Sequence, residues 1–117
     1  MELDTFLQRL NDTPEGIAFD DTMALIDALY EFTPTTFRNG SQLNEAGKNN
    51  GSCKLFSFAR LHGLTPLQAL YCFGDYYRKD VLGNPDGTDH QNIRNFIKTG
   101  WDGISFEGSA LAPKQPD

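Results

Sequence analysis

The chain has 117 residues, close to the commonest size of a single domain and too short for two independent cores. Hydrophobic residues make up 38% of it and include nine Phe, so it can bury a core that a disordered chain could not. Its net charge of −6 would repel nucleic acid, and no apolar run approaches the ~20 residues of a membrane span. We therefore expect one folded domain with no nucleic-acid partner and no membrane insertion.

The two cysteines, Cys53 and Cys72, form no Cys-x-x-Cys pair and have no His at metal-ligand spacing. Each falls in an apolar stretch, so we expect buried core thiols, no metal site and no cofactor. The first residues lack the charged and then apolar pattern of a cleavable secretory signal.

The first half of the chain predicts two helices. Four apolar residues of the segment 2–10 recur at three- and four-residue spacing, which predicts an amphipathic helix. Asp20 and Asp21 are good N-caps for a second helix that runs to about Leu29, with Tyr30 on its inward face.

A β-prone segment follows at residues 35–37 and ends at the turn signal Asn39-Gly40, which closes a hairpin or finishes a short strand. Residues 104–106 have a similar composition. Because a two-stranded sheet is marginal in isolation, we expect these two segments to pair and to pack on the helices.

Capping residues predict three more helices. Ser52 caps a helix over residues 53–61, and Thr65 with Gln68 forms the capping box of a helix over residues 66–78.

A fifth helix starts after Thr88 and ends at Gly100, with His90, Ile97 and Trp101 on its inward face. The sequence thus predicts a mainly helical α+β domain over residues 1–111, with about five helices, one or two short strands and a flexible tail at 112–117.

Two polar segments, residues 44–52 and 83–92, combine turn chemistry with functional side chains, and each leads into a helix. Since buried amides need partners, we expect the two segments to meet. They form either a sealed network or an open polar pocket lined by aromatics such as Tyr76, Tyr77 and Trp101. The expected ligand- or partner-binding residues are Asn44, Glu45, Asn49, Asn50, Asn84, Asp86, Asp89, His90, Asn92 and Arg94.

His90 is the strongest candidate for chemistry. With Asp86, Asp89 or Glu45 it could form a carboxylate-polarised imidazole that acts as a general base. The alternative is structural, since residues 84–87 read as a type I turn and a helix start follows. Glu45 could also pair with Arg94, and His62 is expected to cap helix carbonyls.

Both polar segments, together with Leu64-Thr65-Pro66, Phe73-Gly74-x-Tyr76-Tyr77 and Thr99-Gly100-Trp101, resemble the HopJ-type type III effector family over nearly the whole chain. The resemblance implies a protein of the bacterial cytoplasm that a type III machine secretes into a host cell. It implies no particular enzymatic activity.

Three hypotheses of function follow. The leading one is a monomeric, non-enzymatic protein that binds a partner protein. The others are a resident bacterial domain that binds a small polar ligand, and a small hydrolase or transferase that uses His90. The last lacks a nucleophile in an elbow context.

Overall fold

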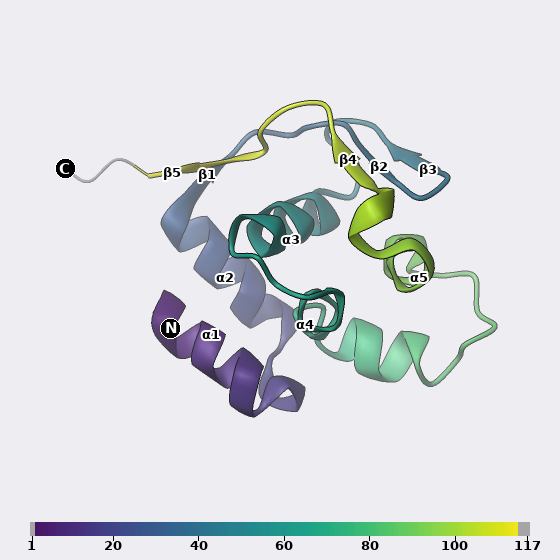
Figure 1. Ribbon diagram of the computed structural model, residues 1–117, viewed down its shortest axis with the longest axis horizontal. Helices are drawn as coiled ribbons and strands as arrows, with labels where there is room; N and C mark the ends of the chain where they lie inside the picture. Colours follow the sequence, from purple (N-terminus) through teal and green to yellow (C-terminus); the bar gives the residue numbers. More distant parts are fainter. Residues whose placement is uncertain (1, 115–117) are drawn as a thin grey trace.

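The computed structural model describes residues 2–114 and places helices on one side of the molecule and short strands along the other (Figure 1). The mainly helical α+β domain predicted from the sequence is confirmed. The α-helices are α1 (Leu3–Asp12), α2 (Phe19–Leu29), α3 (Asn50–Leu61), α4 (Pro66–Tyr71) and α5 (Gln91–Thr99). Two 3-10 helices and one π-helix complete the helical part: η1 (Pro14–Gly16), η3 (Gly100–Gly103) and the π-helix η2 (Tyr76–Val81).

The strands form two small antiparallel sheets. One pairs β1 (Tyr30–Phe32) with β5 (Leu111–Pro113), and the other has the order β3-β2-β4, from β2 (Phe37–Asn39), β3 (Gln42–Asn44) and β4 (Ile104–Phe106).

Two expectations about the strands are confirmed. The segments near residues 36 and 105 pair, with Phe37 opposite Phe106. The Asn39-Gly40 signal closes a hairpin, because Asn39 faces Gln42 and Gly40 has a φ of +60°, a conformation that glycine adopts without steric cost.

The sheet of β1 and β5 was not predicted. Tyr30, expected on the inward face of the second helix, instead begins β1 opposite Pro113. The strand β5 therefore includes Ala112 and Pro113, two residues beyond the boundary predicted for the tail, while residues 115–117 lie outside the described residues. Strands of three residues are too short to show an alternating pattern in the sequence.

Helix α4 ends at Tyr71, well before the predicted end at residue 78. Gly74 lies at a φ of +63°, which no α-helix accommodates, and its Cα packs against the backbone of Phe19 at the start of α2. The Thr22 hydroxyl of α2 donates a hydrogen bond of 2.9 Å to the Cys72 carbonyl in the same turn. The packing of this turn on α2, and not the helical propensity of its residues, thus determines where α4 ends.

Phe56 of α3 is the centre of the aromatic core. Its ring contacts four others that come from β2, the turn after α4, α5 and η3, with centroid distances of 4.8–6.3 Å: Phe37, Phe73, Phe96 and Trp101. Edge-to-face and tilted pairs of this kind add to the free energy gained by burial. Helix α3 therefore joins the strand side of the fold to the helical side.

Cys53 and Cys72 are free and buried, as expected of core thiols. Burial raises the pKa of Cys72 to about 12, so its thiol stays protonated. His62 is the C-cap of α3, as predicted, and its backbone N–H donates to the Phe58 carbonyl at 3.1 Å. Its ring does not bond to helix carbonyls, because Nε2 lies 2.8 Å from the Tyr30 hydroxyl. Partial burial of the His62 ring lowers its pKa.

Gly74→Ala should destabilise the protein more than Gly63→Ala. Both glycines have a φ of +63°, but a Cβ at Gly63 meets nothing within 4 Å, whereas at Gly74 it would lie 2.6 Å from the Phe19 backbone nitrogen. We expect a loss of about 1 kcal/mol for Gly63→Ala from strain alone and about 3 kcal/mol for Gly74→Ala, measured by urea unfolding. Equal losses would show that the contact between Gly74 and α2 does not matter.

Candidate functional site

Helices α3 and α5 start in the same unusual way. Their N-cap residues, Asn49 and His90, have φ values of 54° and 49°, and they are the non-glycine residues with positive φ within residues 2–114. Neither side chain caps its helix. The helices therefore begin at Asn50 and Gln91 rather than at the predicted starts after Ser52 and Thr88. Because the left-handed conformation is costly for a residue with a Cβ, tertiary contacts must hold both starts.

A buried amide network supplies those contacts. Asn44 at the end of β3 and Asn92 in the first turn of α5 bond reciprocally: Asn44 Nδ2 donates to Asn92 Oδ1 at 3.1 Å, and Asn92 Nδ2 donates to Asn44 Oδ1 at 3.0 Å. Asn49 Nδ2 donates to the same Asn44 oxygen at 2.7 Å, which ties the start of α3 to the pair. The expectation that the two polar segments meet is confirmed.

Asn39, which is fully buried in β2, completes the network. Its Nδ2 donates to the carbonyl oxygen of Asn92 at 2.8 Å and to Asn92 Oδ1 at 3.0 Å. Its Oδ1 is the buried side-chain atom without a hydrogen-bond partner in the described part of the chain. The network thus links both strands of the hairpin and the starts of two helices.

A pocket of about 430 Å³ opens beside this network, where both helix starts meet aromatic residues of α2, of the turn after α4 and of η2. The structure therefore contains both arrangements that the sequence left open, the sealed network and the pocket. The lining residues are Phe19, Gln42, Asn49, Gly51, Ser52, Phe73, Tyr76, His90, Gln91, Asn92 and Ile93.

The aromatic wall of the pocket was predicted only in part. Tyr76 lines it as expected, but Tyr77 is buried against Tyr71, and Trp101 packs in the core with its Nε1 donating to the Leu64 carbonyl. Phe19 and Phe73 line the pocket instead of Tyr77 and Trp101. No local signal marks these two residues, because each reaches the pocket through the packing of the turn after α4 on α2.

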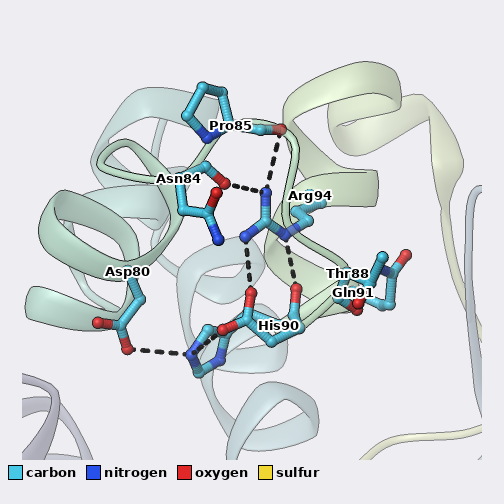
Figure 2. Close-up of polar contacts among 8 residues, drawn as sticks. Asp80, Asn84, Pro85, Thr88, His90, Gln91 and Arg94 are labelled. Carbon is cyan, nitrogen blue, oxygen red and sulfur yellow. Dashed lines mark hydrogen bonds and ion pairs between the residues drawn. The ribbon is translucent and has the colours of Figure 1, made fainter.

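Arg94 organises the loop that precedes α5, and Figure 2 shows its guanidinium enclosed by that loop. It donates to the carbonyl oxygens of Asn84 at 2.9 Å, Pro85 at 3.2 Å and Asp89 at 2.6 Å, and to the Asp89 carboxylate at 2.7 Å. The predicted pairing of Arg94 with Glu45 is wrong, because the loop occupies the guanidinium and Glu45 is exposed to solvent. The hydrogen bond from Arg94 lowers the pKa of Asp89.

His90 precedes α5 instead of lying on its inward face, and its ring sits at the edge of the pocket with 29% of the side chain exposed. Its Nε2 lies 3.1 Å from Asp80 Oδ2 and 3.8 Å from Asp89 Oδ2 (Figure 2). Its ring packs against the ring of Tyr76, with the centroids 5.2 Å apart. Asp80 comes from the π-helix η2, which the sequence did not predict, so this partner was missed.

The remaining candidates do not line the pocket. Asp86 and Glu45 are exposed and do not line the pocket, and Asn50 is exposed on the first turn of α3. Asn84 contributes its carbonyl to the Arg94 cluster and no side-chain hydrogen bond within residues 2–114. Ile97, predicted to face inward, is 48% exposed.

Within residues 2–114, no group of three or more His, Cys, Asp and Glu side chains is placed to hold a metal ion. Among residues 2–114, no helix is both long and apolar enough to span a bilayer.

Comparisons with known proteins agree with the resemblance seen in the sequence. The model of the family described as HopJ type III effector protein matches residues 3–111. The crystal structure of a protein described as "unknown function protein VPA0580" is 54% identical, with a TM-score of 0.96 over 97% of this chain and 95% of that chain. No curated protein matches.

Asn92→Ala should destabilise the fold by about 2 kcal/mol, because it removes the buried side-chain hydrogen bonds that the Asn92 amide makes with Asn44 and Asn39. The control is Asn50→Ala, which removes an exposed amide next to the same network and should change stability by less than about 0.5 kcal/mol. Urea unfolding of both variants measures the difference. A loss for Asn92→Ala no larger than that for the control would contradict a stabilising network.

Replacing Arg94 with Lys should raise the pKa of Asp89 toward its ordinary value, because Lys cannot reproduce the guanidinium fork. In the wild type the pKa of Asp89 is lowered by folding, so its contribution to stability is present above the ordinary carboxyl pKa near 4. This contribution is lost as the pH falls through the lowered value.

A carboxyl ¹³C NMR titration of Asp89 measures this shift. Arg38→Lys, which changes an exposed arginine of β2, should leave the titration of Asp89 as in the wild type. If the pKa of Asp89 is the same in Arg94→Lys as in the wild type, another group lowers this pKa.

Proposed function

We propose that this chain, which belongs to the HopJ type III effector protein family, acts by binding a partner protein around the start of α5. The proposal starts from the family membership, and the shape of the surface around the start of α5 supports binding to a protein.

The observation that carries the proposal is a second hollow next to the first. It also measures about 430 Å³ and shares Gln91 with the pocket, so the two hollows flank the start of α5. Two large apolar side chains on this hollow are about half exposed, Leu82 at 54% and Ile97 at 48%. Two adjoining hollows with exposed apolar and aromatic residues suit a protein segment better than one small molecule.

The positions of the reactive groups support binding over the hydrolase or transferase alternative. Ser52 and His90 both line the pocket, but no hydrogen bond joins them in the described part of the chain. The His90 ring instead faces Asp80, and it would need a nucleophile within about 3 Å to act as its base.

The small-ligand alternative rests on the pocket alone, whose volume falls within the range of small-molecule sites. A ligand of that size would fill the pocket and leave the second hollow empty. We further propose, from the family membership, that the protein is made in the bacterial cytoplasm and delivered by a type III secretion machine.

Gln91→Trp should weaken partner binding at least tenfold, because Gln91 borders both hollows and a Trp there obstructs both. Gln8→Trp is the matched control, since Gln8 is an exposed helical Gln on α1 that lines neither hollow. Partners are captured by cross-linking from host and bacterial lysates, purified, and titrated against both variants by calorimetry.

The wild type and Gln8→Trp should bind the purified partner equally. An empty capture from both lysates, or a partner that binds Gln91→Trp as tightly as wild type, would contradict the proposal. Thermal stabilisation by a metabolite, lost in Gln91→Trp without any captured protein, would favour the small-ligand alternative.

A further inference from the structure

The pocket is lined by uncharged side chains and one histidine, and its surroundings disfavour both signs of charge. No Lys, Arg, Asp or Glu is among its lining residues. A cationic ligand would face the starts of α3 and α5, where helix dipoles place partial positive charge. An anionic ligand would face the carboxylates around the pocket instead.

Four acidic residues surround the pocket without lining it. Asp80 and Asp89 lie 3.1 and 3.8 Å from His90 Nε2 at one edge. Asp20 and Asp75 line an adjoining hollow that shares Phe19 and Tyr76 with the pocket. Asp89 is paired with Arg94 and Asp75 with Arg78, and the positive ends of the two helices oppose the other two carboxylates. The pocket therefore offers no strong charge of either sign, which suits an uncharged occupant.

The aromatic wall favours a flat occupant. Phe73 stacks with Phe19 at 6.2 Å, Phe19 meets Tyr76 edge to face at 5.2 Å, and Tyr76 packs on His90 at 5.2 Å. Tyr76 remains 44% exposed, so part of its ring is open to another ring. Aromatic rings pair in offset or edge-to-face contacts, and such pairs gain free energy beyond that of the apolar area they bury.

Polar atoms around the wall provide hydrogen bonds for the rim of such a ring. The hydroxyls of Ser52 and Tyr76, Asn49 Oδ1 and Gln91 Oε1 make no hydrogen bond with another residue of the range 2–114. They include two acceptors and two hydroxyls that both donate and accept.

We infer that the pocket binds one flat, uncharged ring with a polar edge, supplied by a Tyr or Trp side chain of the partner protein. This inference rests on the proposed function for the source of the ring. The same chemistry could come from a free heterocycle, so the test separates the two sources.

Three ligands with the same ring and different charge test the chemistry: 4-hydroxybenzamide, 4-hydroxybenzoate and 4-hydroxybenzylamine, titrated into ¹⁵N-labelled protein and followed by NMR. The neutral amide should bind with a Kd on the order of 1 mM, as expected of so small a ligand. It should shift the amide signals of Ser52, Tyr76 and Asn92. Both charged ligands should bind at least fivefold more weakly.

Tyr76→Leu should weaken binding of the amide at least fivefold, and because Tyr76 is exposed the variant should stay folded. Leu67→Ala, which changes an exposed side chain of α4 outside the pocket, should bind like the wild type. Equal or tighter binding of a charged ligand, no binding of the amide, or unchanged binding by Tyr76→Leu would each overturn the inference.

Blocked tyrosine, N-acetyl-tyrosinamide, should bind more tightly than adenosine if a partner side chain fills the pocket. Tighter binding of adenosine would overturn that assignment. Partner capture without binding of any ring ligand would overturn this inference alone. Ring binding without a captured partner would overturn the proposed function and leave the ring chemistry intact.

Discussion

The reciprocal amide pair of Asn44 and Asn92 is the interaction on which the rest of the site depends. A buried amide loses its hydrogen bonds to water, so it is stable only where the fold provides partners. Each of these two amides provides them for the other, which fixes the end of β3 against the first turn of α5. Asn49 bonds to the same pair and brings the start of α3 to the same place.

Two other groups of contacts complete this arrangement from either side. The rings around Phe56 hold α3 against β2 and α5 through apolar burial, which is strong but not directional. The guanidinium of Arg94 holds the loop before α5 through directional bonds to three carbonyls and one carboxylate. The pocket lies where the apolar core and the polar network meet, so its walls combine aromatic rings with amides.

The sequence predicted the features that local residues determine, and one contact between distant segments that the need of buried amides for partners determines. The capping box of Thr65 and Gln68 forms as expected, the Asn39-Gly40 signal closes a hairpin, and the amide-rich segments meet because buried amides require partners. The features that it missed depend on other contacts between distant segments, which no residue type in the sequence indicates.

Three of the missed features share that cause. Helix α4 ends before Gly74 because the chain there packs on α2. Asp80 contacts His90 from a π-helix, which no spacing pattern in the sequence predicts. The strand β5 exists because β1 lies beside it. Helix starts at Asn49 and His90 were also misplaced, since their left-handed conformation is imposed by the amide network and the loop around Arg94.

The most direct test of the central role of the amide pair is a double-mutant cycle between Asn44→Ala and Asn92→Ala, measured by urea unfolding. The cycle isolates the energy of the pair from the other contacts of each residue. If the pair holds the site together, the coupling free energy should be about 1–3 kcal/mol in favour of the two amides. A coupling within about 0.3 kcal/mol of zero would mean that the two residues contribute independently, and would contradict this account.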